Sequence, residues 1–177
     1  MEIEICKVGS LETNCYVLKK NDSCLVIDPG NELKKIVKCI GSCKVVGVII
    51  THYHFDHIGA LEELVKLKNA DVYDFHNFKE GKNIICDFVF DVLRVPGHKE
   101  DSICLYFVDE KLMFCGDFIF KDAVGRWDLP GGNFKELQSS IRKILLYSED
   151  LVLYPGHGER TTLKNERKNL ENYLKCF

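Results

Sequence analysis

The stretch Thr51 to Ala60, THYHFDHIGA, constrains this chain more than any other part, because it holds four potential metal ligands within six residues. His52, His54, Asp56 and His57 follow an apolar run at 44–50 and precede an apolar pattern typical of a helix. A buried strand that ends in a short loop can hold such side chains rigidly at a sheet edge. The pattern predicts a metal-binding loop between a strand and a helix.

Three more potential ligands follow other strand-like runs. His98 and His157 each end a Pro-Gly-His segment, and Asp117 follows the apolar run that ends at Cys115. A catalytic zinc site uses about three protein ligands, and a two-metal site needs roughly twice that number with one bridging group. Seven ligands that include a carboxylate therefore predict a site for two metal ions.

The ligand types leave the metal open. Imidazole and carboxylate groups suit zinc, iron and manganese, so we expect two divalent ions, with zinc as the first expectation. The alternative, a set of structural core histidines, is weaker because burying them without charge partners costs free energy. His76 is the one histidine outside these motifs, and we expect it to be exposed or structural.

Length and composition restrict the class of protein. The 177 residues suit one domain, residues 1–177, with a sizeable core. A net charge of −3, with scattered basic residues, gives no reason to expect nucleic acid as a partner. The N-terminal residues lack a secretory signal and no apolar run is long enough to cross a membrane, so we expect a cytoplasmic protein. The nine cysteines are expected to be reduced, since most lie in apolar runs.

Hydrophobic periodicity predicts strands first, then alternating helices and strands. A helix capped by Asn31 is expected to end at Gly41, and Asp109-Glu110 is expected to form a tight hairpin turn. The expected strands are Glu2–Val8, Asn14–Lys19, Ser23–Asp28, Lys44–Ile50, Asp71–Tyr73, Phe88–Val95, Ser102–Val108, Lys111–Cys115 and Asp150–Tyr154, and the other helices are His57–Lys68, Lys135–Tyr147 and Leu163–Leu174. This order favours two face-to-face sheets with helices outside.

The segment HYHFDH resembles the HxHxDH signature of the metallo-β-lactamase superfamily. Asp28, His98, Asp117 and His157 stand in order where that superfamily has its other motifs, and the resemblance runs from about Thr13 to Asn169. It implies an α/β (α+β) fold, the four-layer αββα sandwich, with the metals at one edge between the sheets.

The resemblance also implies a role for each ligand. His52, His54 and His98 would bind the first metal; Asp56, His57 and His157 would bind the second. Asp117 would bridge them, and Asp28 would orient the site from outside the ligand set or simply end a strand as a turn residue. The implied reaction is hydrolysis by a metal-bridging hydroxide, with Asp56 and Asp117 as the catalytic carboxylates.

Within the superfamily, the segments 13–16, 125–132 and 155–162 resemble the compact, glyoxalase II-like hydrolases. That resemblance implies a small-molecule thioester or related acyl substrate, of the hydroxyacylglutathione type. Four substitutions depart from the pattern at Lys99, Asp101, Arg126 and Asp128, and the chain ends without the C-terminal helical domain that helps to grip glutathione. Arg126 and Asp128 either contact substrate or form an ion pair that holds their loop. Trp127 either walls the cleft or packs.

Several alternatives remain beside the thioesterase hypothesis. A persulfide dioxygenase would hold one iron with His52, His98 and Asp117, and a lactone or ester hydrolase would use the same site. A nuclease is disfavoured by the acidic charge, and a β-lactamase by the short chain without a signal peptide. A non-catalytic binding module is disfavoured because the ligand set is complete. The oligomeric state, the acyl group and the thiol carrier stay open.

Overall fold

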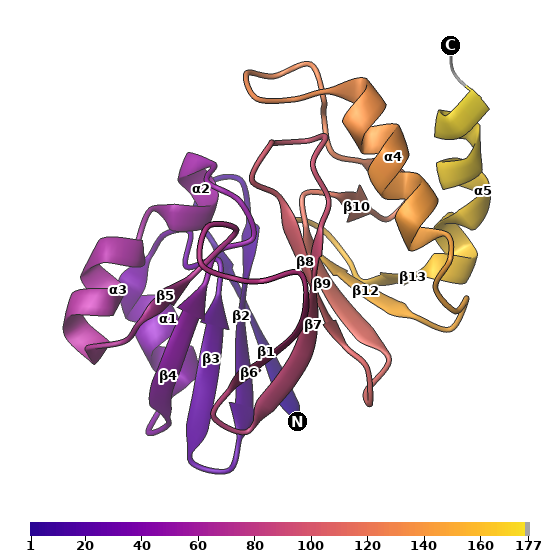
Figure 1. The fold of residues 1–177 in the computed structure, drawn as a ribbon. Helices are drawn as coiled ribbons and strands as arrows, with labels where there is room; N and C mark the ends of the chain where they lie inside the picture. The colour runs from indigo at the N-terminus through magenta and orange to yellow at the C-terminus, as the bar shows by residue number, and fades with distance from the viewer. Residues whose placement is uncertain (176–177) are drawn as a thin grey trace.

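A computed structural model describes residues 1–175 of the chain, which form two main sheets, a small hairpin and five helices (Figure 1). The strands are β1 Glu2–Val8, β2 Thr13–Lys20, β3 Ser23–Ile27, β4 Lys44–Ile49, β5 Val72–Tyr73, β6 Gly81–Ile85, β7 Phe88–Arg94, β8 Ile103–Phe107, β9 Leu112–Gly116, β10 Ile119–Phe120, β11 Ala123–Val124, β12 Val152–Pro155 and β13 Thr161–Thr162. The helices are α1 Leu33–Ile40, α2 Phe55–Ile58, α3 Leu61–Lys68, α4 Phe134–Ile144 and α5 Leu163–Lys175.

The first sheet has the order β1-β2-β3-β4-β5 and the second has the order β13-β12-β9-β8-β7-β6. Strands β1 to β3 pair antiparallel as expected, and β4 and β5 then join in parallel. In the second sheet β12 pairs with β9 in parallel, and the other pairs are antiparallel. Strands β7, β9 and β12 therefore run in the same direction, and their carboxyl ends meet at one edge of the sheet.

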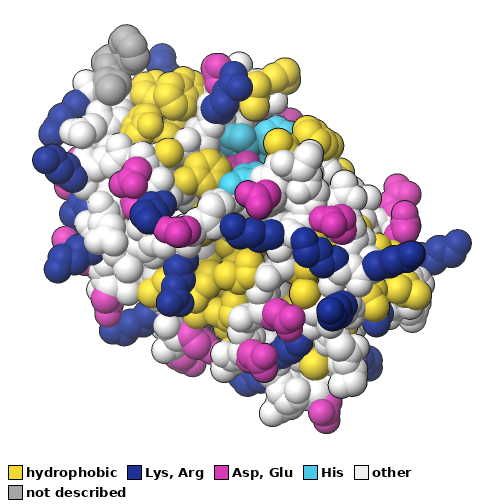
Figure 2. Space-filling view, turned by 180° about the vertical axis from the view of Figure 1, so that it is seen from behind, with side chains coloured by type: hydrophobic (Ala, Val, Ile, Leu, Met, Phe, Trp, Pro, Cys, Tyr) yellow, Lys and Arg dark blue, Asp and Glu magenta, His cyan; other side chains and the backbone are white. Residues whose placement is uncertain are grey.

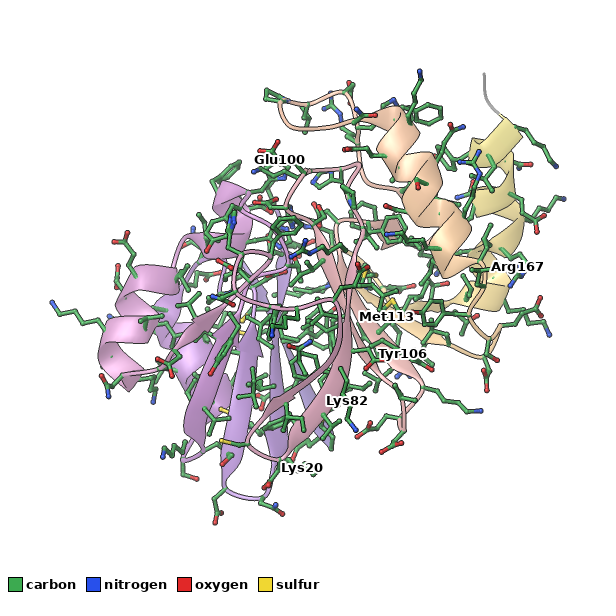
Figure 3. The ribbon with its side chains drawn as sticks, in the orientation of Figure 1. Lys20, Lys82, Glu100, Tyr106, Met113 and Arg167 are labelled. Carbon is green, nitrogen blue, oxygen red and sulfur yellow. The ribbon has the colours of Figure 1, made fainter. Side chains whose placement is uncertain are left out.

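Three apolar clusters correspond to the three interfaces of a four-layer sandwich. The first lies between the sheets and contains Leu18, Ile49 and Phe114. The second packs α4 and α5 on the second sheet, where Met113 and Tyr106 lie on the helix side (Figure 3). The third packs α1 and α3 on the first sheet. Alternate strand residues face opposite clusters, as the two-residue period of a strand requires. The predicted αββα arrangement is confirmed (Figure 1).

Two local predictions were wrong. The expected helix His57–Lys68 is two helices, α2 and α3, separated at Gly59 and Ala60. At this break the Ala60 N–H donates to the Pro29 carbonyl at 3.0 Å, outside the helix, and Gly59 packs so close to Gly30 that an added Cβ would lie 2.2 Å from the Gly30 carbonyl oxygen. Asn31 does not cap α1; its Oδ1 accepts a hydrogen bond from the Glu32 backbone N–H, one residue before the helix.

Four short strands were not predicted: β6, β10, β11 and β13. Three of them are two residues long, too short for a periodic pattern, and β6 carries the polar sequence GKNII at a sheet edge. The hairpin at Asp109-Glu110 is confirmed, with the Lys111 N–H bonded to the Val108 carbonyl. Gly41 ends α1 with a positive φ of 63°, as expected.

The eight cysteines among residues 1–175 are free thiols, and five of them are buried, which agrees with the expected reduced state. Cys176 lies outside the described residues. None of the helices in the described part of the chain has the length and apolar character needed to span a membrane. His76 is exposed and belongs to neither of the potential metal-binding groups found among the described residues.

Candidate metal centre

The segment between β4 and α3 carries the first four candidate ligands. His52 follows β4, His54 is the residue before α2, and Asp56 and His57 lie within that single helical turn. The segment is fastened to the second sheet, because the Ile103 N–H of β8 donates to the Thr51 carbonyl at 2.9 Å. The histidine loop of the first sheet is thereby held against the edge where the second sheet ends.

The other three candidate ligands come from that edge. His98 follows β7, Asp117 follows β9 and His157 follows β12. In the parallel pair of β9 and β12, Pro155 lies opposite Gly116, so Asp117 and His157 leave the sheet side by side. Three strand ends from one sheet and one loop from the other thus converge on a single place.

The first ligand group consists of His52, His54, His98 and Asp117. His54 Nδ1 lies 3.0 Å from His52 Nε2 and 2.9 Å from His98 Nε2. Asp117 Oδ2 lies 3.9 Å from His52 Nε2 and 3.6 Å from His98 Nε2. His98 is oriented by its Nδ1, which lies 2.7 Å from the Arg126 carbonyl as a hydrogen-bond donor. Its Nε2 is therefore free to face the other ligand atoms.

The second ligand group consists of Asp56, His57 and His157. Asp56 Oδ2 lies 3.4 Å from His57 Nε2 and 3.2 Å from His157 Nε2. Asp117 also reaches this group, with Oδ1 3.3 Å from His57 Nε2 and Oδ2 3.5 Å from His157 Nε2. Because Asp117 contacts histidines of both groups, it occupies the position that a bridging ligand needs.

The seven side chains fit a pair of divalent metal ions. Ligand atoms at about 2.0–2.2 Å from a tetrahedral zinc ion are about 3.3–3.6 Å apart, close to the separations found here. Two buried atoms, His57 Nε2 and Asp117 Oδ1, have no hydrogen-bond partner among the described residues. Buried polar atoms without partners are rare and costly, and a metal ion between the two would satisfy both.

Asp28 is buried behind both groups. Its carboxylate lies 2.9 Å from His57 Nδ1, and it accepts hydrogen bonds from the Thr51 N–H at 2.8 Å and the Thr51 hydroxyl at 2.6 Å. The Thr51 oxygen in turn lies 3.2 Å from His52 Nδ1. Asp28 thus orients the His57 ring directly and orients the His52 ring through Thr51. In both histidines the Nε2 atom then faces the ligand groups. It does more than end a strand.

The two groups differ in their electrostatics. Burial lowers the pKa of His52 well below its usual value, and burial together with His98 lowers that of His54. Burial would also lower the pKa of His57, but the carboxylates of Asp28 and Asp117 raise it to about 10. Likewise, Asp117 and Asp56 overcome the effect of burial and raise the pKa of His157 to about 9.

The segment Thr13 to Tyr16 supports the second group from the first sheet. The Thr13 hydroxyl donates to Asp56 Oδ2 at 2.9 Å. Asn14 Nδ2 donates to the carbonyls of Pro155 and Gly158, and the Tyr16 hydroxyl donates to the Pro155 carbonyl. These bonds fasten the turn that carries His157 to β2. Sequence reasoning quoted this segment as a motif but did not foresee that Thr13 holds a candidate ligand.

The ligand groups open into a cavity of about 840 Å³. Figure 2 shows the histidine side chains at the bottom of a hollow with hydrophobic side chains beside it. The apolar lining comes from Leu11, Phe55, Phe120, Leu129 and Pro130, and two basic residues, Lys99 and Arg126, complete it. Periodicity did not indicate the apolar lining residues, because Phe55 and Leu11 are exposed hydrophobic residues in loop-like sequence.

The three candidate substrate residues lie in different surroundings. Arg126 lines the cavity but forms a two-point hydrogen-bonded ion pair with Asp128, at 3.0 and 2.8 Å. Asp128 is exposed and does not line the cavity. Trp127 packs against Phe134 and Tyr173, with ring centroids 4.8 and 5.9 Å away. These contacts agree best with an ion pair between Arg126 and Asp128 and with a packing role for Trp127.

The fold, the ligand pattern and the sequence agree on the family. Residues 8–77 and 87–157 match the model of the metallo-beta-lactamase superfamily, and the chain belongs to that superfamily. Among curated relatives, an uncharacterized protein of Aquifex aeolicus is 34% identical and the probable metallo-hydrolase YqgX of Bacillus subtilis is 32% identical. The alignment with the Aquifex protein covers 94% of this chain and 94% of that protein. The alignment with YqgX covers 90% of this chain and 92% of YqgX.

A further relative and two solved structures bear on activity and metal. The hydroxyacylglutathione hydrolase GloC of Haemophilus influenzae is 29% identical, with 96% of each chain covered. The BLEG-1 B3 metallo-beta-lactamase has a TM-score of 0.89 and 28% identity, covering 94% of this chain and 97% of its own. A di-iron-bound form of TTHA1623 has a TM-score of 0.85 and 28% identity, covering 93% and 97%. These neighbours share the four-layer fold.

Proposed function

We propose that this protein is a two-metal hydrolase that cleaves thioesters, with hydroxyacylglutathione-type thioesters as the first substrate class. The observation that carries the proposal is the pair of ligand groups joined by Asp117 at the base of an open, apolar cavity. Such a site is suited to attack on a carbonyl carbon by water. The similarity to GloC over nearly the whole chain supports the choice of a thioester.

The cavity lining favours hydrolysis without a covalent intermediate on the protein. No serine, threonine or cysteine is among the residues that line it within the described part of the chain. Two divalent ions bound there would lower the pKa of a water molecule and polarise the substrate carbonyl. The side chains themselves would position the metal-binding groups. Asp117 contacts both groups, Thr13 orients Asp56, and Asp28 orients His57.

The same geometry argues against a one-iron persulfide dioxygenase. An iron held by His52, His98 and Asp117 would leave Asp56, His57 and His157 as a complete second group without a role. It would also leave His57 Nε2 buried without a partner. A lactone or β-lactam as substrate would use the same carbonyl chemistry, and the similarity to a B3 metallo-beta-lactamase makes a β-lactam the natural comparison substrate.

The test is a turnover screen of protein reconstituted separately with zinc, iron and manganese. The substrates are lactoylglutathione, an acyl thioester of a small neutral thiol, a simple lactone and a β-lactam, with oxygen uptake on glutathione persulfide as a separate assay. We expect thiol release from the thioesters to exceed hydrolysis of the lactone and β-lactam, with two metal ions per chain. One iron per chain with rapid oxygen uptake would replace the proposal with the dioxygenase.

A further inference from the structure

We propose that Lys99 recognises an anionic group of the substrate, a carboxylate, at the wall of the cavity beside the first ligand group. The inference rests on the proposed function for the nature of the substrate and extends it to one specific recognition contact. It assigns the ligand a chemical class: a molecule with an apolar body, a scissile acyl bond and a carboxylate placed to reach the ammonium of Lys99.

The position of Lys99 is set by its neighbour. It directly follows His98 in the loop between β7 and β8, which is marked by Glu100 in Figure 3, and it lines the cavity together with His54 and His98. Only 20% of its side chain is exposed to solvent. An ammonium in such a partly desolvated place interacts with an anion more strongly than one in bulk water.

The ammonium of Lys99 keeps hydrogen-bonding capacity for a ligand. Its one hydrogen bond among residues 1–175 goes to Asp101 Oδ2, at a long 3.4 Å. A lysine has three N–H donors, so the contact leaves others available. Asp101 is itself buried and is fastened to the histidine loop, since the same Oδ2 accepts the Tyr53 N–H at 3.3 Å. Asp101 therefore holds the side chain of Lys99 in place.

The second cation of the cavity is less suited to this task. Arg126 is bound at two points to Asp128, and 67% of its side chain is exposed. Its charge is compensated by a paired carboxylate and screened by water. The remaining lining is mainly apolar, with Leu11, Phe55 and Phe120 around the metal-facing groups. Lys99 is instead paired with Asp101 at one point and at the longer distance of 3.4 Å, so a ligand with an apolar body meets it as the less firmly paired cation of the wall.

The test measures binding without turnover, by calorimetry with thioether analogues that cannot be hydrolysed. One analogue is the butyl thioether of N-acetylcysteamine, and the second has the terminal methyl of the butyl chain replaced by a carboxylate. A third has the carboxylate on the thiol side, so that the two sources of the anion are distinguished. We expect one carboxylated analogue to bind at least about tenfold more tightly than the neutral one.

Lys99→Met is expected to abolish that preference, and Lys99→Arg to retain most of it because the charge remains. Lys111→Met is the matched control: it removes an exposed lysine outside the cavity and should leave the preference unchanged. Thermal unfolding of each variant checks that it is folded. Equal binding of all three analogues by the natural protein would overturn the inference. So would a preference that survives in Lys99→Met, since the carboxylate would then bind at the metal ions instead.

The two proposals fail in different ways. Absence of thioester turnover, with the Lys99-dependent preference intact, would reject the proposed function and leave the anion contact standing. Turnover of neutral and carboxylated thioesters at equal kcat/KM, together with equal binding of the analogues, would reject the anion contact at Lys99 and leave the proposed function standing. When both proposals hold, Lys99→Met raises KM for the carboxylated thioester by a much larger factor than KM for the neutral one.

Discussion

The two ligand groups are neighbours that share Asp117, yet they differ in charge. In the first group, burial of His52 and His54 favours the neutral imidazole, as their lowered pKa values show. The second group places His57 and His157 among carboxylates, which favour the protonated imidazolium and raise both pKa values. The difference comes from where the acidic residues lie: Asp56 and Asp28 contact only the second group directly.

The two groups therefore differ in how their protonation and charge affect the binding of a metal ion. His52 and His54 of the first group already favour the neutral form that a metal ion requires. The second group has the greater negative charge to attract a cation, but its histidines must first lose their protons. We expect the two groups to bind metal with different pH dependences, and the following predictions test that expectation in order of decreasing effect.

Asp117→Ala should have the largest effect, because Asp117 contacts both groups. Loss of a group that only orients a metal ligand commonly lowers metal affinity or activity about 10–100-fold, so loss of this shared candidate ligand should exceed about 100-fold. Metal content after dialysis and thioester turnover are the measurements. His76→Ala is the control, since His76 is an exposed histidine outside both groups. Turnover that persists in a metal-free Asp117→Ala variant would refute the two-metal mechanism.

Asp28→Asn should weaken the second group more than the first, by about 10–100-fold in metal affinity. The substitution keeps the size of the side chain but leaves one acceptor oxygen in place of the two that hold Thr51 and His57 Nδ1–H, and it removes a negative charge that would attract a metal cation. Metal titration followed by competition with a chelator would resolve the two affinities. The effect on the first group should be smaller because Asp28 reaches His52 only through Thr51. Equal losses of metal affinity at both groups would contradict the expectation that Asp28 acts mainly on the second group.

Metal uptake by the second group should release protons. With pKa values raised to about 10 and about 9, His57 and His157 are protonated near neutral pH in the metal-free protein, and ligation requires their neutral forms. Filling this group near pH 7 should therefore release about two protons, and its affinity should rise with pH until about pH 9–10. His52 and His54 of the first group should release almost none, because their pKa values are lowered. Calorimetry in buffers of different ionisation enthalpy measures the proton count, and a value near zero for both groups would contradict the prediction.

The smallest effect is expected at Arg126. Its guanidinium is exposed and bound at two points to Asp128, which leaves it little capacity to contact substrate, so Arg126→Ala should change thioester kcat/KM by no more than about twofold. Trp127→Ala offers the contrast within the same loop, because the indole packs on Phe134 and Tyr173, and we expect a loss of about 3 kcal/mol in unfolding free energy. Denaturant unfolding and kinetics measure both. A large kinetic loss in Arg126→Ala would mean that Arg126 contacts the substrate.

Much of the architecture could be predicted because its signals are local. The apolar run before His52 and the Pro-Gly-His segments placed the histidines at strand ends without knowledge of the sheets. The break between α2 and α3 was not predictable in this way, because the Ala60 N–H there is bonded to the distant Pro29 carbonyl, and Gly59 packs against Gly30. The contacts of Thr13 and of the apolar cavity wall were missed for the same reason.

The sequence by itself determined the residue types and their places at strand ends, since ligand chemistry and strand periodicity are properties of short segments. Apart from what the family resemblance implied, only the tertiary structure decided which ligands stand together. The parallel pairing of β9 and β12 brings Asp117 beside His157, and Gly156 allows the approach: an added Cβ would lie 2.2 Å from Asp117 Oδ1 and 2.7 Å from His57 Cε1. Distances between strand ends depend on sheet pairing and close packing, which join residues far apart along the chain.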